Sequence, residues 1–321
     1  MQAGRAVTAP AALTDSLLGA TERAALSAIF AERVRFDEPL APHTSWKIGG
    51  PADAFALVEN TAELAALMRY VFKRKLPWFV LGSGSNLLIG DGGIRGVVIR
   101  LAGEFARIEF LESAPGEVLA RAGASASLAL FTAQAASRGA EGVGSIAGIP
   151  GSVGGALRMN AGTDREIGEF VVEVRVQSPS RPEPRAVGVQ YFYRHTSLAH
   201  DAIVADVTLR FAAADPGVVR EEMQARLVRR KRTQPLQLPN AGSCFRNPPN
   251  DKAGRLIEAV EAKGWREGGA EVSPLHANFI VNHGTATAAD VATLLARVRR
   301  AVAERFGVEL ELEVHFVGVF A

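Results

Sequence analysis

Cysteine, an excess of charge and long apolar runs are scarce or missing in this sequence. Its 321 residues include one cysteine, Cys244, so the chain can form no internal disulfide. The 36 basic and 34 acidic residues leave a net charge of +2, which argues against a broad nucleic-acid surface. No apolar run is long enough to cross a bilayer, and no secretory signal is recognisable. The sequence therefore predicts a cytoplasmic globular protein that binds neither membranes nor nucleic acid.

Basic residues form one local cluster, from Arg226 to Arg232, which reads Arg-Leu-Val-Arg-Arg-Lys-Arg. Such a run is typical of the solvated end of a helix. A non-catalytic module that binds nucleotides or nucleic acid through this cluster is the alternative. Both interpretations stay open on the sequence.

The helical and strand patterns divide the chain into an extension and three regions. Residues 1–20, rich in alanine and threonine, are expected to form a flexible extension. Residues 21–96 alternate helix and strand, residues 97–215 are mostly strands, and residues 216–321 are mixed. This length suits two or three domains. The fold class expected is therefore α+β.

Apolar spacing places the elements within these regions. Helices are expected at residues 21–33, 61–73, 127–138, 218–232, 253–263 and 287–306. Strands are expected at residues 54–58, 77–81, 97–101, 107–112, 118–122, 171–177, 203–211, 277–282 and 309–317. Thr287 with Asp290 three residues later fits an N-terminal capping box.

A short glycine loop, Gly-Ser-Gly-Ser-Asn at residues 82–86, follows the strand expected at 77–81. Glycines let backbone N–H groups point together toward an anion, and the serine and asparagine side chains add donors. The loop is no P-loop, and Leu87 stands where a dinucleotide motif has its third glycine. By itself it is as typical of a tight turn as of a ligand site.

A second segment, residues 142–162, is denser in glycine. Glycine costs conformational entropy on folding, so this density indicates a reason beyond packing. We expect the backbone here to approach a large flat or phosphorylated ligand.

Several motifs, taken together, resemble one enzyme family. They are His-Thr-Ser-Trp-Lys-Ile-Gly-Gly-Pro-Ala at 43–52, the loop 82–88, Gly-Ile-Pro-Gly-Ser-Val-Gly-Gly at 148–155, Tyr193-Arg194, Asn-Ala-Gly-Ser-Cys-Phe-Arg-Asn-Pro at 240–248, His-Ala-Asn-Phe-Ile-Val-Asn at 276–282 and Leu-Glu-Val at 312–314. In this order they resemble the UDP-N-acetylenolpyruvoylglucosamine reductases, over residues 35 to 318. One departure is Thr196, where the family usually has serine. The short stretch between Arg194 and Ser243 is similar to the shorter form of the family.

The resemblance implies a fold, a cofactor and a reaction. It implies a two-domain FAD-binding fold of the vanillyl-alcohol-oxidase-like type, followed by a C-terminal α+β substrate domain. FAD would be bound without a covalent link and reduced by NADPH, and it would then reduce UDP-N-acetylglucosamine enolpyruvate to UDP-N-acetylmuramate. The residues expected to hold FAD are Gly82, Ser83, Gly84, Ser85, Asn86, Gly148, Ile149, Pro150, Gly151, Gly154, Gly155, Asn160, Ala161 and Gly162.

Three further residues match the catalytic positions of the family. Arg194 would hold the substrate carboxylate, for which a planar cationic fork is well suited. Ser243 would donate the proton that follows hydride transfer. Glu313 would support the enol intermediate, although Glu309, Glu311 and Glu313 would share the exposed face of a regular strand.

Lys231 and Asn247 match positions that contact the substrate, which assigns the basic cluster a use at the diphosphate. His43 belongs to the entry motif at 43–52, so it is not expected to carry a covalent flavin.

Some assignments stay open on the sequence. Cys244 is the rival proton donor, and only one of two neighbours in an extended chain can face the flavin. The roles of His276 and Asn278 are undecided. A related FAD-dependent oxidoreductase with another small substrate is the alternative function. We expect a monomer and no metal site.

Overall fold

The computed structural model describes residues 16–320 of the chain. Most of the expected extension lies outside this range, but its last residues join the fold. The Leu18 side chain is 4% exposed, and the Leu17 backbone N–H donates to Asp53 Oδ2 at 3.0 Å. No helix in the described range is long and apolar enough to span a membrane.

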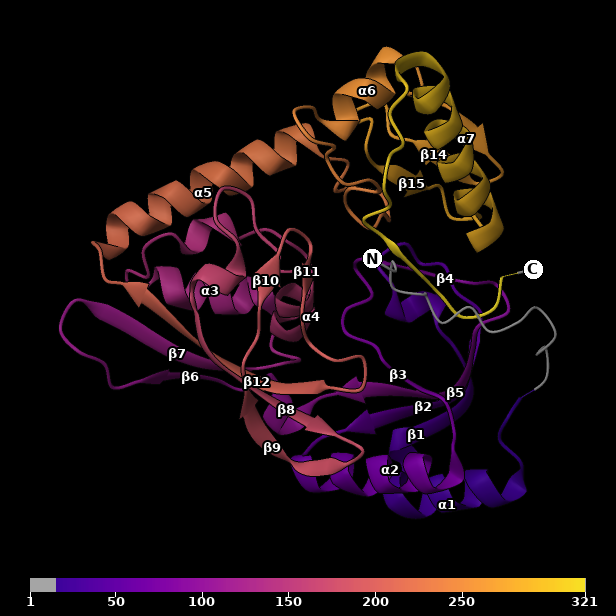
Figure 1. Ribbon diagram of the computed structural model, residues 1–321, viewed down its shortest axis with the longest axis vertical. Helices are drawn as coiled ribbons and strands as arrows, with labels where there is room; N and C mark the ends of the chain where they lie inside the picture. Colours follow the sequence, from indigo (N-terminus) through magenta and orange to yellow (C-terminus); the bar gives the residue numbers. More distant parts are fainter. Residues whose placement is uncertain (1–15, 321) are drawn as a thin grey trace.

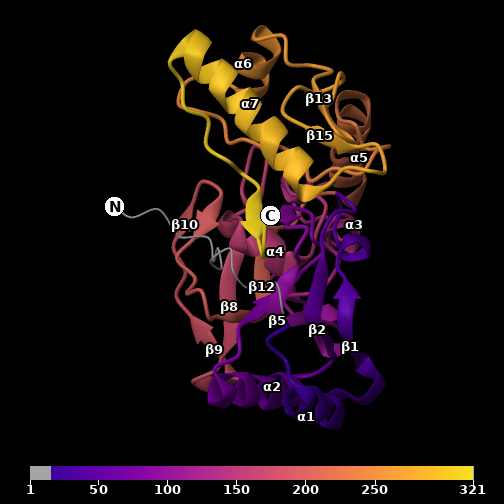
Figure 2. The same cartoon turned by 90° about the vertical axis from the view of Figure 1, so that its right-hand side faces the viewer.

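The first sheet has four strands in the order β1-β2-β5-β3. Its elements are β1 (Val34–Pro39), β2 (Pro51–Val58), β3 (Trp78–Val80), β5 (Ile94–Leu101) and the helices α1 (Ala20–Phe30) and α2 (Thr61–Arg74). Strands β2, β5 and β3 are parallel, and β1 pairs antiparallel with β2. Figure 2 shows α1 and α2 at the end of the molecule remote from α7. The expected division at residue 96 falls inside β5, so this sheet extends to Leu101.

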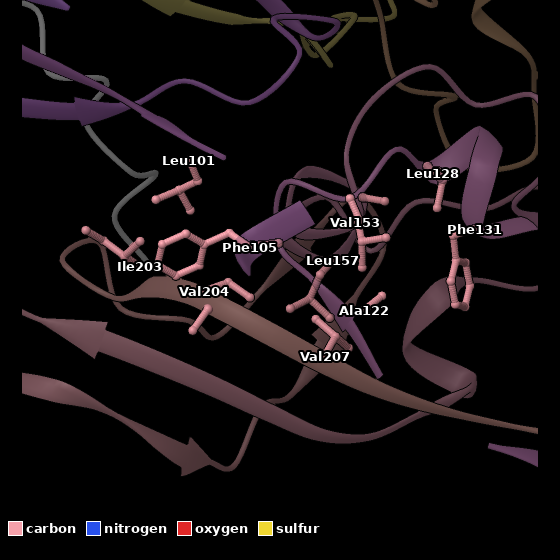
Figure 3. Close-up of a cluster of buried hydrophobic side chains, with 14 of the residues drawn as sticks. Leu101, Phe105, Ala122, Leu128, Phe131, Val153, Leu157, Ile203, Val204 and Val207 are labelled. Atoms are coloured by element: carbon pink, nitrogen blue, oxygen red, sulfur yellow. The ribbon is translucent and has the colours of Figure 1, made fainter. Parts of the chain in front are cut away.

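The second sheet has five antiparallel strands in the order β6-β7-β12-β8-β9. They are β6 (Ile108–Leu111), β7 (Glu117–Gly123), β8 (Val171–Ser178), β9 (Arg181–Val187) and β12 (Ile203–Ala212). The helices α3 (Leu128–Ala136) and α4 (Val153–Arg158) pack beside it, and the hairpin β10 (Tyr191–Phe192) and β11 (His195–Thr196) lies next to α4. One apolar cluster joins this unit to the first sheet, and part of it is drawn in Figure 3.

The third region contains α5 (Pro216–Thr233), α6 (Ala253–Ala259), α7 (Ala288–Phe306) and the small sheet β13 (Arg266–Glu267), β14 (Ala270–Val272) and β15 (Ile280–Asn282). The capping box of Thr287 and Asp290 is confirmed at the start of α7. The strand expected at 309–317 is wrong over residues 309–314. Only β16 (His315–Val317) is a strand, and it leaves the third region to pair with β4 (Leu87–Ile89). Figure 1 shows this region, orange to yellow, above the other two.

Short 3₁₀ helices connect several of these elements. They are η1 (Ala31–Arg33), η2 (Ala41–His43), η3 (Gly103–Ala106), η4 (Val143–Ser145) and η5 (Ile167–Glu169).

Trp46 and Asp91 tie the third region to the first. The Trp46 side chain is fully buried in the core of the third region, and its Nε1–H donates to the Ile280 carbonyl at 2.8 Å. In return, Asn282 Nδ2 donates to the Trp46 carbonyl at 2.9 Å. Asp91 accepts the backbone N–H groups of Ala288 and Ala289, the first residues of α7, at 2.8 and 3.0 Å. Side chains from distant parts of the sequence therefore position the third region.

Candidate active site

The two glycine segments lie against each other. The Ser85 hydroxyl donates to the Pro150 carbonyl at 2.9 Å. A Cβ placed on Gly151 would stand 3.2 Å from the Ser85 hydroxyl, and one on Gly82 would stand 3.2 Å from the Ser152 hydroxyl. Backbone and serine side chains of the two segments thus form one surface.

Several of these glycines make room for protein. Gly84 has φ +62°, and a Cβ there would lie 2.5 Å from the His43 carbonyl oxygen. A Cβ on Gly148 would lie 2.8 Å from Leu227 of α5, and one on Gly154 would lie 2.8 Å from the Ala124 Cβ. Packing within the protein therefore accounts for glycine at these positions, because the His43 backbone, the Leu227 side chain and Ala124 stand where a Cβ would be. For Gly148 and Gly154, the expectation that packing would not explain the glycines of residues 142–162 is wrong.

The chemistry around the two segments fits a flavin dinucleotide. Ser152 caps α4 by accepting the Gly155 N–H at 3.2 Å, so N–H groups and hydroxyls gather here. Arg100 donates to the Gly82 carbonyl, and burial lowers the pKa of its guanidinium. Arg230 packs on Gly148; burial lowers the pKa of its guanidinium, and its Nε has no hydrogen-bond partner among the described residues. Two half-buried cations beside donor-rich backbone suit an anionic, phosphate-bearing ligand.

Two residues expected to hold FAD are used within the protein. Asn160 is 2% exposed, and its amide donates to the Phe192 carbonyl at 3.1 Å and accepts the Gly168 N–H at 3.0 Å. The Asn86 amide donates to the Glu313 carbonyl at 3.0 Å. Their side chains therefore anchor the β10–β11 hairpin and the final segment at the edge of the glycine surface.

Arg194 lies in the turn of the β10–β11 hairpin, with φ +60°. Its Nε–H donates to Glu313 Oε1 at 2.9 Å, and an Nη2–H donates to the Gly162 carbonyl at 3.1 Å. Glu166 lies on its other side, with Oε1 at 3.6 Å from Nη1. The guanidinium is thus held at the end of the second glycine segment between two carboxylates.

Glu313 is not the exposed strand carboxylate that its spacing allowed. Its side chain is 18% exposed, whereas Glu309 and Glu311 are 75% and 76% exposed. The backbone bends before β16, so the regular alternation that would align these three residues is lost. Burial raises the pKa of the Glu313 carboxyl, and the Arg194 charge opposes that rise.

Ser243 is joined to Glu313 through the next residue. The Cys244 carbonyl accepts the Glu313 N–H at 2.8 Å, and Phe245 forms a bridge with Leu312. Cys244 itself is 1% exposed, and burial raises the pKa of its thiol to about 12. Ser243 is half-buried, so it retains exposed surface that Cys244 lacks.

The structure does not join the expected substrate residues to this cluster. Lys231 is exposed on α5, and Asn247 is exposed with its Oδ1 accepting the Ala253 N–H at 3.1 Å. Among the described residues, neither forms a hydrogen bond or ion pair with Arg194, Ser243 or Glu313. The basic cluster is partly used, since Arg226 forms an ion pair with Asp164 at 2.5 Å.

Sequence reasoning missed Glu166 and His315 beside the cluster. Burial raises the pKa of the Glu166 carboxyl. The His315 N–H donates to the Asn86 carbonyl at 3.0 Å, and its Nε2 lies 3.2 Å from the Met159 sulfur. For His315 the signal was its place two residues after Glu313. Nothing local pointed to Glu166.

Two family models match this chain. The FAD binding domain matches residues 52–180, and the C-terminal domain of UDP-N-acetylenolpyruvoylglucosamine reductase matches residues 234–317. The expected α+β fold, with an FAD-binding part followed by a C-terminal substrate domain, is thereby confirmed.

Curated relatives and a solved structure agree with these models. UDP-N-acetylenolpyruvoylglucosamine reductase 2 of Symbiobacterium thermophilum is 48% identical over 89% of this chain and 92% of its own length. The reductase of Moorella thermoacetica is 45% identical over 89% of this chain and 94% of its own. The crystal structure of the reductase from Thermus caldophilus superposes with a TM-score of 0.74 at 35% identity, covering 88% of this chain and 98% of that one.

Proposed function

The chain belongs to the UDP-N-acetylenolpyruvoylglucosamine reductase family, and from this premise we propose that Arg194, Ser243 and Glu313 form its catalytic centre. The enzyme reduces UDP-N-acetylglucosamine enolpyruvate to UDP-N-acetylmuramate with NADPH, through FAD, in peptidoglycan precursor synthesis. The observation that carries the proposal is the 2.9 Å contact of Arg194 with Glu313, whose backbone N–H bonds the residue after Ser243.

The substrate is a vinyl ether that carries a carboxylate. Hydride addition to its terminal carbon drives electrons toward the carboxylate and produces an enediolate, which then needs a proton on the adjacent carbon. When bound, FAD supplies that hydride after accepting one from NADPH. The protein must therefore stabilise charge at the carboxylate and deliver a proton to one carbon.

Arg194 meets the first demand. Its guanidinium is always charged, and its planar fork matches a carboxylate on which negative charge is growing. Bonds to Gly162 and Glu313 hold the guanidinium in place before the substrate arrives. A Glu313 carboxyl that burial keeps protonated to higher pH competes less with the substrate for this cation and can donate a hydrogen bond to the enediolate.

Ser243 meets the second demand. Its hydroxyl is a weak acid, but an enediolate carbon is basic enough to take its proton when the geometry is held. The buried Cys244 thiol faces the core, which favours Ser243 over its neighbour as the donor.

The diphosphate of the substrate is anionic, and Lys231, Asn247 and the basic end of α5 are the groups we assign to it. All residues of the proposed centre come from one chain, so a monomer is sufficient for the reaction. We also propose a cytoplasmic location for the enzyme.

Stopped-flow absorbance at the flavin band tests this function. NADPH alone should bleach the band, and anaerobic addition of the enolpyruvyl substrate should restore it. Bleaching without recovery would support the alternative, a related FAD-dependent oxidoreductase with another small substrate. A purified protein without flavin absorbance would contradict both.

Ser243→Ala tests the proton donor, with Cys244→Ala as the neighbouring control. We expect Ser243→Ala to bleach at the wild-type rate and to recover about 10²–10⁴ times more slowly, since only the second half-reaction needs the proton. Cys244→Ala should recover normally. The reverse result would move the role to Cys244, and equal slowing of both half-reactions by Ser243→Ala would contradict the assignment.

A further inference from the structure

The backbone of Cys244 and Phe245 is held on two sides by two residues. All four of its polar groups are paired. The Cys244 N–H donates to the Asn278 carbonyl at 2.9 Å, and the Cys244 carbonyl accepts the Glu313 N–H at 2.8 Å. The Phe245 N–H donates to Asn278 Oδ1 at 2.9 Å, and the Phe245 carbonyl accepts from Asn278 Nδ2 at 2.8 Å. Asn278 therefore supplies three of these bonds and Glu313 supplies the fourth.

The Asn278 amide acts here as a short piece of strand. Its donor and acceptor bind the carbonyl and N–H of one residue, as a neighbouring strand would in a ladder. Asn278 is 4% exposed, so both bonds form away from water, where an unpaired partner would be costly. Its own N–H lies 3.3 Å from His276 Nδ1, which accepts it, so the turn before β15 is also held.

The bonds of Asn278 to the Cys244 and Phe245 backbone form a clamp, and this clamp adjoins the proposed centre. The clamped segment begins directly after Ser243, and its opposite edge bonds the backbone of Glu313. Ser243 and Glu313 lie far apart in the sequence, so their relative placement depends on this segment. The start of the turn is held separately by Asn240, which forms a bridge with Val281 and whose Oδ1 accepts the Gly242 N–H at 3.0 Å.

We propose that Asn278 is a positioning residue, which holds the Ser243 hydroxyl in register with Glu313 and Arg194 for proton delivery. The inference rests on the proposed function and adds a residue that touches neither substrate nor cofactor. It also assigns a role to the motif at 276–282, which the catalytic proposal left unused. Reduction of FAD by NADPH does not need the Ser243 proton, so Asn278 serves the second half-reaction alone.

Asn278→Asp is the sharpest test, because it keeps the shape of the side chain and replaces the donor. The ionised carboxylate would face the Phe245 carbonyl without a proton between them, and the clamp would open. A displacement of about 1 Å at a reacting group costs on the order of a hundredfold in rate. We expect bleaching by NADPH within about twofold of wild type and recovery on substrate about a hundredfold slower, since misplacement is the cost.

Lower pH provides a rescue that a general loss of stability would not show. When the new carboxyl group is protonated it can again donate to the Phe245 carbonyl. Recovery by Asn278→Asp, relative to wild type at each pH, should therefore accelerate as pH is lowered. Asn278→Ala offers no such donor, so its slow recovery relative to wild type should stay independent of pH.

Asn282→Ala is the matched control. Asn282 is also a buried amide, 2% exposed, in the same motif, but it bonds the Trp46 carbonyl and the turn after β15. Its loss should lower the stability of the FAD-loaded protein while the ratio of the two half-reaction rates stays at the wild-type value.

Each outcome decides the inference. Recovery of Asn278→Asp at the wild-type rate over the whole pH range at which the protein is folded would overturn it, and so would equal slowing of both half-reactions or the same ratio change in Asn282→Ala. If Asn278→Ala does not yield folded protein, the pH rescue of Asn278→Asp still decides it. If the wild-type flavin fails to recover on substrate, the proposed function fails first, and that result is distinguishable from a failure of the clamp alone.

Discussion

The glycine surface and the charged cluster beside it are built in different ways. Backbone groups and small hydroxyls of two continuous segments, residues 82–86 and 148–155, form the glycine surface. The charged cluster comes from distant segments. The Arg194 side chain bonds Glu313, and the Glu313 N–H bonds the Cys244 carbonyl next to Ser243, so the cluster depends on bonds that close over long sequence separations. A backbone surface can be recognised from local composition. A side-chain cluster depends on the whole fold.

The glycine surface and the charged cluster should also respond differently to pH and to substitution. Backbone N–H groups do not titrate and are lost only if the backbone moves. The charged cluster does contain a titratable group with an altered pKa, since burial raises the pKa of the Glu313 carboxyl. Substitutions should therefore separate cofactor binding from catalysis.

Among the substitutions that test this comparison, Arg194→Lys should produce the largest effect. Lysine keeps the charge, but it loses the planar fork that holds Glu313 and the Gly162 carbonyl. We expect flavin recovery on substrate to slow by about 10²–10³-fold, as for loss of one transition-state donor. Bound FAD and bleaching by NADPH should stay at wild-type values in the same stopped-flow traces.

Arg299→Lys is the control for this change, since Arg299 is a surface residue of α7 with half of its side chain exposed. It should alter neither half-reaction. Loss of FAD from Arg194→Lys would show that the cluster and the glycine surface are not separable.

Gly84→Ala should affect the glycine surface, with a smaller effect. The new Cβ would meet the His43 carbonyl at 2.5 Å in a left-handed conformation, so the loop must shift. We expect FAD affinity to fall roughly tenfold, which corresponds to about 1.4 kcal/mol, measured by fluorescence titration of the apoprotein.

Gly116→Ala is the control that separates backbone strain at a positive φ from displacement of the loop by a steric clash. Gly116 also has a positive φ, +85°, but a Cβ there would meet nothing within 4 Å. It should cost about 1–2 kcal/mol of folding stability and leave FAD affinity unchanged. Equal loss of affinity in both variants would contradict a local role of the 82–86 loop.

Glu313 should produce the smallest effect, a change in how stability depends on pH. Because its pKa is raised in the folded state, the folded protein binds this proton more tightly than the unfolded chain. Its contribution is therefore most favourable at low pH and is lost as pH rises through the folded pKa. The free energy of unfolding of wild type minus that of Glu313→Gln should decrease from pH 5 to pH 8 in urea titrations of the FAD-loaded proteins.

A pH-independent difference for Glu313→Gln would show that burial does not disfavour its charge.

Much of the fold follows from local pattern. The helices α2, α5 and α7 were predicted because their apolar residues repeat at helical spacing, and for α7 a capping box also marked the start. Strands β1 and β9 were missed because charged residues and proline obscure the apolar alternation of a strand in both. Both are edge strands, and pairing with β2 and β8 places them in their sheets. Helix α4 was missed because two of its residues are glycine, although Ser152 caps it.

The site divides in the same way. The two glycine loops are continuous in sequence, and the residues of the catalytic motifs were identified through resemblance to a family. The clamp of Asn278 on Phe245 was not foreseen, because a buried asparagine in an apolar strand motif gives no sign of its distant partner. The burial of Glu313 was not foreseen either, since the bend before β16 cancels the strand alternation.

Local sequence pattern is sufficient to predict the composition class, most helices and central strands, and the positions of the two glycine-rich segments. These depend on interactions within a few residues, where spacing, caps and glycine conformations act directly. The burial of Glu313, the placement of the Cys244 side chain in the core and the bonds of the Asn278 amide could be learned only from the folded chain. The physical reason is that burial and hydrogen-bond partners across long separations are set by the packing of the regions on one another.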